Sequence, residues 1–509
     1  MTRPTVTDTG IVLRPDPSRV ISRLFVAGRE ELGPGESRAG AVIERVLALS
    51  EGETRRTAAE VRRKFRRRHD YFAELIDEHV EQIVGRLDPL IPLSAERRFL
   101  LGACFTQEYA IEAAALCNPS IVLHPQQPVH KAGKQSGTGT GAARFVLSVR
   151  GIGEGHRSSI GFRTGSVSGT GAVRIDAPSR HVTGPRWEAG LHHRSVAHAH
   201  LSGHEEDADD AEFVLSMLPD SFDSRQLEAA MQRLIDDRAT RGEIGATLER
   251  LRDFARASYR VAFRPESEVS SRVLSPLAPR ESHGMEDARF VRFVADDGVV
   301  TYYATYTGWD GRWTCQQMAA TTDFVHFDVS PVGGAAATGK GLALFPRMIG
   351  GRYAALSRSD RETNAVSFST DLRCWHDRQV IQAPQRPWEL LQVGNCGSPI
   401  ETDSGWLVLT HGVGAFRTYH LGALLLDLED PTQVIGYSRE PVLSPGDLTR
   451  DGYVPNVVYS CGALAHGDLL VLPFGIADQS IGIVTLSIDE LLDSMTSDGR
   501  VRTRRVATG

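Results

Sequence analysis

Three features are scarce in this sequence: cysteine, long apolar runs and an excess of positive charge. The six cysteines are scattered over 509 residues and no two form a CxxC pair, so neither a zinc site nor a disulfide framework is predicted. No apolar run approaches the roughly 18 residues of a membrane-spanning helix, and the first residues lack the apolar segment of a secretory signal. We therefore expect a cytoplasmic protein without a membrane partner, whose thiols are reduced and mostly buried.

The net charge of −7 gives no overall attraction to nucleic acid. One basic run does occur, RRKFRRR at residues 62–68, and a nucleic-acid patch is one interpretation of it. Because the chain as a whole is acidic, we favour a solvated helix face or a subunit contact and expect no nucleic-acid partner.

A helical segment is predicted over residues 37–117, after an extended arm at 1–35 that is punctuated by proline and glycine. Ser50 and Glu53 have the spacing of a capping box, and Ser94 could begin a further helix that runs to about Leu116. One apolar face recurs at helical spacing in Val61, Phe65, Phe72, Ile76, Val80 and Ile83. This face is too extensive to leave in water, so we expect it to pack on the rest of the protein and to join the subunits of a homo-oligomer.

From residue 118 onward, dense glycine and short alternating runs such as RFVLSVRG and SSIGFRTG are typical of strands. Two segments, TTDFVHF and STDLRCW, share one pattern and place Asp323 and Asp371 48 residues apart. A period near 40–50 residues with several strands per unit indicates propeller blades. We therefore predict a mainly β protein, a five-bladed β-propeller, with a β-sandwich as the alternative.

The predicted organisation has three parts: an N-terminal arm and helical segment at 1–117, a propeller domain at 118–487 with a helical insertion at about 208–258, and a C-terminal helix and tail at 488–509. Just before the insertion, HHRSVAHAH would place His198 and His200 on one face of a strand. No acidic or sulfur ligand stands at metal-binding spacing beside them, so no metal is predicted.

The segment HGMEDARFVRF at 283–293 holds a candidate general acid. On a regular strand, Asp287 and Arg289 point to one face and Glu286 points to the other. A carboxylic acid in a sugar-filled channel could protonate a leaving glycosidic oxygen, provided that desolvation raises its pKa. The alternative is an Asp–Arg ion pair at a turn.

Other polar residues suit an anion or a sugar. Arg150 and Arg163, in SVRGIGEGHRSSIGFRTG, could bind phosphate, although a solvated surface hairpin is the alternative. Trp388 and Trp406 could stack on sugar rings or pack in the core. The segment DGYVPNVVYSCG at 451–462 offers further polar groups to sugar hydroxyls.

These residues resemble a known family. GMEDARF is similar to the G-x-E-D-P-R signature of the mannoside phosphorylases of glycoside hydrolase family 130, and KGLALFP resembles that family's N-K-D-x-x-L-F-P block. LSRSD, GSPIETDSGWLVLTHGV, GALLLDLEDPTQVI and YVPNVVY resemble its later blocks in the same order, over roughly 118–487. The chain resembles a subgroup with an N-terminal helical extension.

The resemblance implies a five-bladed propeller that acts on β-mannosides with inversion. Asp287 would be the acid, passing its proton through a sugar hydroxyl, and phosphate would attack the anomeric carbon to give mannose 1-phosphate. No cofactor is implied, only inorganic phosphate as co-substrate and a β-mannoside oligosaccharide as partner. The phosphate ligands would be Arg150, Arg163, Gln392 and His411. The substrate ligands would be Asn118, Glu286, Arg289, Lys340, Arg358, Asp451 and Asn456.

The sequence departs from the family pattern at three positions. Ala288 replaces a proline, and Gly341 stands where an aspartate follows Lys340. Gln392 occupies what resembles the position of a phosphate-binding lysine, and losing a cation weakens an anion site. A β-mannosidase on the same scaffold is therefore the first alternative, and a non-catalytic carbohydrate-binding propeller is the second.

Overall fold

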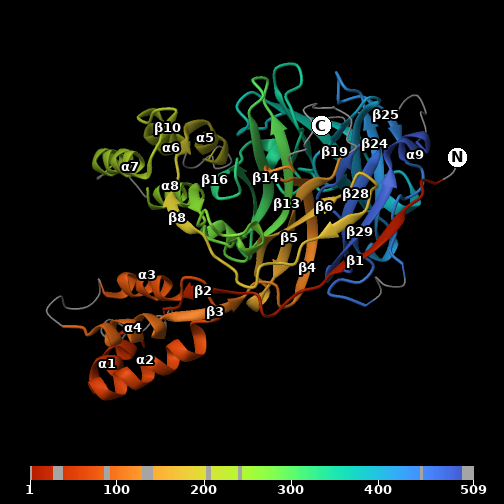
Figure 1. Ribbon diagram of the computed structural model, residues 1–509. Coiled ribbons are helices and arrows are strands. Elements are labelled where there is room, and N and C mark those ends of the chain that lie inside the picture. The colour runs from red at the N-terminus through yellow and green to blue at the C-terminus, as the bar shows by residue number, and fades with distance from the viewer. Residues whose placement is uncertain are drawn as a thin grey trace.

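The computed structural model describes residues 3–26, 38–84, 92–128, 141–201, 208–238, 244–446 and 451–495. The protein is mainly β, and two groups of helices lie beside a body of strands (Figure 1). Among the described residues, no helix combines the length and the apolar character needed to cross a bilayer.

Within the described chain, the strands of this body divide into five mainly antiparallel units, each built mainly from strands consecutive in sequence. Units 1 and 2 belong to one 11-stranded sheet, in which a parallel pairing of Gly284 with Ser158 joins them. Unit 1 contains β4 (Ala115–Leu123), β5 (Ala143–Ile152), β6 (Ser158–Val167) and β7 (Val173–Ile175). Unit 2 contains β13 (Gly284–Val294), β14 (Val300–Trp309), β15 (Thr314–Thr321) and β16 (His326–Pro331). Unit 3 contains β17 (Ala343–Leu344), β18 (Tyr353–Ser357), β19 (Asn364–Ser369) and β20 (Arg378–Gln382).

Units 4 and 5 complete the body. Unit 4 contains β21 (Gln392–Asn395), β22 (Ile400–Thr402), β23 (Gly405–Val413), β24 (Tyr419–Leu426) and β25 (Val434–Tyr437). Unit 5 contains β26 (Val458–Tyr459), β27 (Leu464–His466), β28 (Leu469–Ile476), β29 (Ser480–Ser487) and, from the other end of the chain, β1 (Thr7–Leu13). Part of the predicted N-terminal arm is therefore a strand of the last sheet.

Five shorter strands extend or flank these units. Two of them, β11 (Tyr259–Ala262) and β8 (Arg186–Ala189), extend unit 2 beyond β16, and β12 (Val273–Leu274) pairs with β6. The two-residue strand β9 (His192–His193) pairs with β10 (Ser221–Phe222) near the insertion.

The repeated sequence pattern forms the turn between the third and fourth strands of units 2 and 3. Asp323 accepts hydrogen bonds from two following backbone amides at 2.8 and 2.9 Å. Asp371 does the same at 2.9 Å for both. A short carboxylate that caps the backbone two and three residues onward explains why aspartate recurs at this place.

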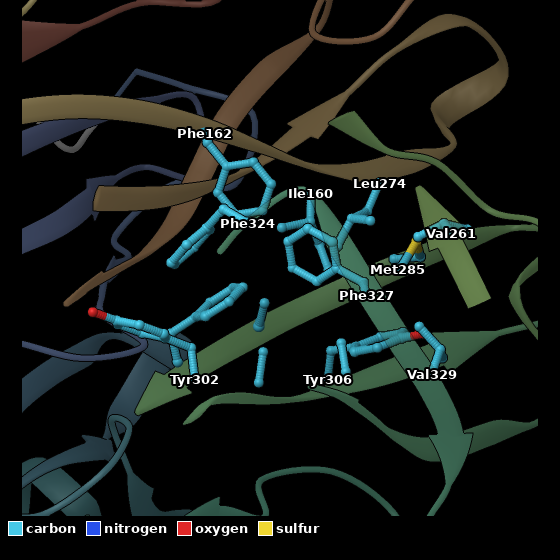
Figure 2. Packing of buried hydrophobic residues seen from close by; sticks show 14 of the residues in the cluster. Ile160, Phe162, Val261, Leu274, Met285, Tyr302, Tyr306, Phe324, Phe327 and Val329 are labelled. Carbon is cyan, nitrogen blue, oxygen red and sulfur yellow. The ribbon is translucent and has the colours of Figure 1, made fainter. Parts of the chain in front are cut away.

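Buried apolar clusters join the units. Phe162 of unit 1 meets Phe324 and Phe327 of unit 2 in the cluster of Figure 2, with the Phe162 and Phe324 ring centroids 5.6 Å apart. Further clusters join units 2 and 3, 3 and 4, 4 and 5, and 5 and 1. Every unit therefore packs against the one before it and the one after it.

The N-terminal helices are α1 (Arg38–Ala48), α2 (Glu51–Phe65), α3 (Phe72–Val84) and α4 (Ala95–Cys104). The predicted capping box is present at the start of α2. The predicted third helix does not reach Leu116: α4 ends at Cys104, and β3 (Thr106–Ala110) pairs with β2 (Val20–Leu24). Pairing with a distant segment outweighs the helical pattern there, because tertiary context overrides local propensity.

The long apolar face of these helices is covered from within the group. It is split between α2 and α3, and all of its members except Phe65 belong to two clusters formed mainly by the four helices. Ile76, Val80 and Ile83 are buried, whereas the other three residues of the face are half-buried. Contacts with the β body include polar ones, such as the hydrogen bond from the Tyr71 hydroxyl to Glu266 at 2.9 Å. The helices therefore cover much of this face among themselves, and the homo-oligomer predicted for it stays a prediction.

The insertion contains α5 (Arg194–Leu201), α6 (Ala208–Ser216), α7 (Ser224–Arg238) and α8 (Gly245–Arg256), so it begins earlier than predicted. His198 and His200 lie on α5 and not on a strand. The closing helix is α9 (Ile488–Asp493), capped by Ser487.

Candidate active site

Polar residues of four units meet at the first strand of each unit. The Asn118 amide, on β4 of unit 1, donates a hydrogen bond to the carboxylate of Asp287, on β13 of unit 2. Arg289 of the same strand donates to the Tyr459 hydroxyl of unit 5 at 2.8 Å. Lys340, just before unit 3, binds Glu286 at 2.5 Å. Since these residues lie far apart in sequence, only the packing of the units brings them together.

A β-bulge shapes the strand that carries the candidate acid. Glu286 is paired with Thr307 and Arg289 with Thr305, so two residues of β13 oppose one residue of β14. Asp287 has a φ of +56°, in the left-handed region. As a result, Arg150 lies 2.6 Å from the Glu286 carboxylate and 3.7 Å from that of Asp287. The prediction that the two carboxylates point to opposite faces is therefore wrong, because the bulge interrupts the alternation.

The charges around Asp287 determine its protonation. Burial alone would raise the pKa of Asp287, but Lys340, Arg150 and Arg289, together with the hydrogen bond from Asn118, hold it below the ordinary 3.8. A general acid at this position requires that desolvation raise the pKa of Asp287, and the ligand-free protein does not meet this requirement. Asp287 is therefore ionised at neutral pH until something offsets the positive charge around it.

A second group of polar residues surrounds Gly394 of β21. A Cβ atom on this glycine would lie 2.4 Å from both Arg358 and His411, so these two side chains approach each other closely. His411 is 1% exposed, and its ring stacks on Tyr419 and meets Tyr459 edge-on. Burial, followed by the charges of Arg358 and Arg289, lowers the pKa of His411 well below its usual value, so the imidazole is neutral.

Several buried polar atoms of these two groups lack a hydrogen-bond partner among the described residues. They are Nε of Arg150, Arg289 and Arg358, Oδ1 of Asn118 and Nε2 of His411. Buried polar atoms in folded proteins are nearly always satisfied, so this concentration indicates a place where a polar ligand binds. Most of these atoms are donors, which suits an anion and the hydroxyl groups of a sugar.

Arg163, a predicted phosphate ligand, does not join either group. Its guanidinium donates to both carboxylate oxygens of Glu112 at 2.8 Å, and Arg19 binds the same carboxylate at 2.8 Å. All three residues are at most 4% exposed. Arg163 is therefore removed from the phosphate set, because a buried ion triple between the N-terminal arm and unit 1 already holds it.

The remaining predicted residues lie outside the contacts described above. Gln392 is half-buried at the start of β21, and Asp451 is exposed. Asn456 is half-buried, and its backbone oxygen accepts a hydrogen bond from Tyr419 at 3.0 Å. Trp406 is fully buried in the core between units 3 and 4, which agrees with the interpretation that it packs in the core. Trp388 is half-buried and packs over unit 4.

The sequence analysis missed Asp478, in the turn between β28 and β29. A Cβ atom on Gly475 would lie 3.8 Å from an Asp478 oxygen and 3.6 Å from the Asn118 nitrogen, which places this carboxylate beside the first group. Burial raises the pKa of Asp478 to about 6; Asp287 and Glu286 act in the same direction, while Arg150 and Arg417 oppose them. The only local signal was an aspartate in a short turn, which is too common to single out a functional residue.

Comparison with known proteins adds the following. A family model described as beta-1,4-mannooligosaccharide phosphorylase matches residues 255–497. The chain is 35% identical over 224 residues to a 1,2-beta-oligomannan phosphorylase of Thermoanaerobacter sp. (strain X514), covering 43% of this chain and 73% of the relative. It is 31% identical over 235 residues to a beta-1,2-mannobiose phosphorylase of Listeria innocua serovar 6a, covering 45% of this chain and 64% of the relative. A solved structure of beta-1,2-mannobiose phosphorylase from Listeria innocua is 22% identical and aligns with 74% of this chain and 99% of its own, with a TM-score of 0.41.

Proposed function

The chain belongs to the mannoside phosphorylases of glycoside hydrolase family 130, and from this membership we propose that it cleaves β-mannosides with phosphate and releases mannose 1-phosphate. The observation that carries the proposal is the pairing of the two polar groups: a carboxylate held by Asn118 and three cations, and unsatisfied donors around Gly394. The first can supply a proton once its carboxylate is protonated, and the second can hold an anion.

In the proposed reaction, the mannosyl unit lies between Asp287 and a phosphate bound near Arg358 and His411. The Asp287 proton passes through a sugar hydroxyl to the glycosidic oxygen, the C1–O bond breaks, and a phosphate oxygen attacks C1 from the opposite face. The products are α-mannose 1-phosphate and an oligosaccharide shorter by one unit. Because phosphate brings its own negative charge, no second carboxylate is needed as a base.

Phosphate binding also offers a way to protonate Asp287. The cations that lower the pKa of this residue are Lys340, Arg150 and Arg289. A phosphate anion bound near Arg358 and His411 would add negative charge to the site and raise the pKa again, since a nearby negative charge disfavours ionisation of a carboxyl. In this proposal the acid gains its proton only when the nucleophile is present, which couples the two halves of the site.

We propose further that the five units are the blades of a five-bladed β-propeller. Two features support this architecture: the apolar clusters join each unit to the next and unit 5 to unit 1, and β1 completes the sheet formed by β28 and β29. First strands that meet at one place are expected where blades converge on a central axis.

Hydrolysis is the second candidate, and Gln392 is the observation that favours it, since an amide stands where the resemblance implies a lysine. Incubation with β-1,2-mannobiose, with and without phosphate, separates the two. Phosphorolysis predicts mannose 1-phosphate only when phosphate is present, whereas free mannose alone, unaffected by phosphate, would establish hydrolysis.

The acid assignment is tested by Asp287→Asn, which keeps the size of the side chain and removes its proton. We expect turnover to fall at least 1,000-fold, on the order of the loss of general acid catalysis, with an unchanged unfolding temperature. Asp296→Asn, at the exposed far end of the same strand pair, is the matched control. Equal rates for wild type and Asp287→Asn would refute the assignment, and wild type that binds the sugar without turning it over would indicate a carbohydrate-binding protein.

A further inference from the structure

The N-terminal helices are joined to the β body through the ribbon of β2 and β3, which is closely followed by β4, the strand of Asn118 (Figure 1). Tyr109 of β3 is 5% exposed, and its hydroxyl donates a hydrogen bond to the Glu154 backbone oxygen at 2.7 Å. The Arg23 guanidinium of β2 lies over the same ring, 4.1 Å from its centroid. Because Glu154 begins the turn between β5 and β6, the ribbon holds this turn shortly after Arg150.

The main chain that follows Arg150 lies directly against the ribbon, with no side chain between them. A Cβ atom on Gly153 would lie 2.0 Å from the Ala110 backbone oxygen, and one on Gly151 would lie 2.7 Å from that of Ile111. Only glycine permits backbones to approach this closely. A side chain at either glycine would therefore force the ribbon and the end of β5 apart.

The same turn also reaches unit 5. His156, at its tip, has a φ of +57°, and its Nδ1 atom lies within hydrogen-bond distance of the Tyr453 hydroxyl, at 3.0 Å. The centroids of the two rings are 6.0 Å apart. Residues other than glycine seldom take this left-handed conformation, and here it brings the imidazole to the loop before β26. The His156–Tyr453 bridge therefore joins units 1 and 5.

The loop of Tyr453 rests on the turn that carries Asp478. The Val454 amide donates a hydrogen bond to the Ala477 backbone oxygen at 2.9 Å, and a Cβ atom on Gly452 would lie 2.3 Å from the Ala477 side chain. Ala477 and Asp478 both have a positive φ, +50° and +48°. Such a conformation persists in non-glycine residues only when the surrounding structure holds it. The loop therefore supplies part of the support that this turn needs.

We propose that Tyr109 is a positioning residue for the reaction, which acts on Asp478 through the bridge and on Arg150 through the end of β5. Arg150 lies 3.7 Å from the Asp287 carboxylate, and Asp478 lies beside Asn118, which binds that carboxylate. The inference rests on the proposed function, because only there is Asp287 the acid. In this proposal the N-terminal helices and their ribbon support the active site and are not a separate appendage.

The first test is Tyr109→Phe, which keeps the ring under Arg23 and removes the hydroxyl that holds the turn. In the phosphorolysis of β-1,2-mannobiose we expect kcat to fall about 5-fold, the size expected from the loss of one buried hydrogen bond. KM for phosphate should stay within about 2-fold, because this series of contacts does not include Arg358 or His411. A general loss of folded enzyme would lower the active fraction and the unfolding temperature together, so the unfolding temperature is measured alongside.

A second variant and a matched control define the route. Tyr453→Phe should lower kcat as Tyr109→Phe does, and the double variant should lose no more than either single variant, since both substitutions interrupt one series of contacts. Tyr71→Phe removes another hydroxyl that bonds the N-terminal helices to the β body, at Glu266, and should keep the wild-type kcat. Additive losses in the double variant would contradict a shared route.

Hydrogen–deuterium exchange measures the same connection without turnover. Tyr109→Phe should speed amide exchange at residues 477–480 about 5-fold, although these residues are remote in the sequence. Gly153→Ala should do the same, because the φ of −104° suits alanine and only the contact with the ribbon is disturbed. Gly184→Ala, where a Cβ atom would meet nothing within 4 Å, and Tyr71→Phe are the controls and should leave this exchange unchanged.

A wild-type kcat in Tyr109→Phe, or an equal loss in Tyr71→Phe, would overturn the proposal, and so would unchanged exchange at residues 477–480. If the wild type turns over no β-mannoside, the proposed function fails, and the exchange measurement alone decides whether the ribbon positions Asp478. Should Tyr109→Phe fail to fold, Tyr453→Phe, at a residue that is 44% exposed, carries both measurements.

Discussion

Asp478 provides a direct test of how charge is arranged around the candidate acid. Its pKa is raised to about 6 from the ordinary 3.8, chiefly by burial and further by Asp287 and Glu286, against the opposing charges of Arg150 and Arg417. An elevated pKa means that the ionised form is disfavoured in the folded protein. The difference between the two values corresponds to about 3 kcal/mol, which the folded state loses once the carboxyl is fully ionised.

The loss depends on pH in a defined direction. Because the folded protein binds this proton more tightly than the unfolded chain, the stability is fully present below about pH 3.8 and is lost as pH rises through about 6. The loss is about 1.6 kcal/mol at pH 5 and about 3 kcal/mol at pH 8, from the linkage of the two pKa values. Asp478→Asn cannot ionise, so its advantage over wild type should grow by about 1.4 kcal/mol between these two pH values.

The assay is urea unfolding at pH 5 and pH 8, followed by the fluorescence of the buried tryptophans Trp375 and Trp406. The comparison of two pH values cancels any constant effect of the amide, and Asp296→Asn at an exposed turn gives the baseline. An advantage of Asp478→Asn that is equal at both pH values, or larger at pH 5, would refute the assigned environment.

Two further predictions concern phosphate. Arg358→Met should raise KM for phosphate at least 10-fold in steady-state kinetics, because a guanidinium beside His411 is lost. Arg163→Met should instead lower the unfolding temperature and leave KM for phosphate within about 2-fold, because Arg163 binds Glu112. Equal effects of the two substitutions on KM for phosphate would contradict the assignment of Arg358, and not Arg163, to the phosphate site. Gln392→Lys should lower KM for phosphate several-fold by adding a cation, and Gln392→Glu should raise it; no difference between the two would place Gln392 outside the anion site.

The sequence was sufficient wherever a feature depends on neighbouring residues. The recurring aspartates at 323 and 371 predicted repeated units, and each one caps its own turn through amides two and three residues away. The capping box of Ser50 and Glu53 is likewise local. The ordered motifs around Asp287 were enough to indicate the family that the comparisons then established.

The ends of helices and the contacts between distant segments were harder to predict from the sequence. The helix after Ser94 was predicted too long, because nothing local reports that Thr106–Ala110 pairs with Val20–Leu24. The sequence also does not show that four short helices cover much of the apolar face among themselves, and the subunit contact expected of this face stays a prediction. Both features depend on contacts between segments that are remote in the chain.

The sequence by itself determined that Asp287 is present, in a strand-forming segment with a glutamate before it and an arginine two residues after it. Only the tertiary structure decided what this carboxyl does at neutral pH, because its neighbours come from other units. Asn118 is 169 residues away, and Arg150 is 136 residues from Glu286. Electrostatic interactions depend on distance in space, so the bulge, the ionised state of Asp287 and the role of Asp478 follow from packing and not from motif.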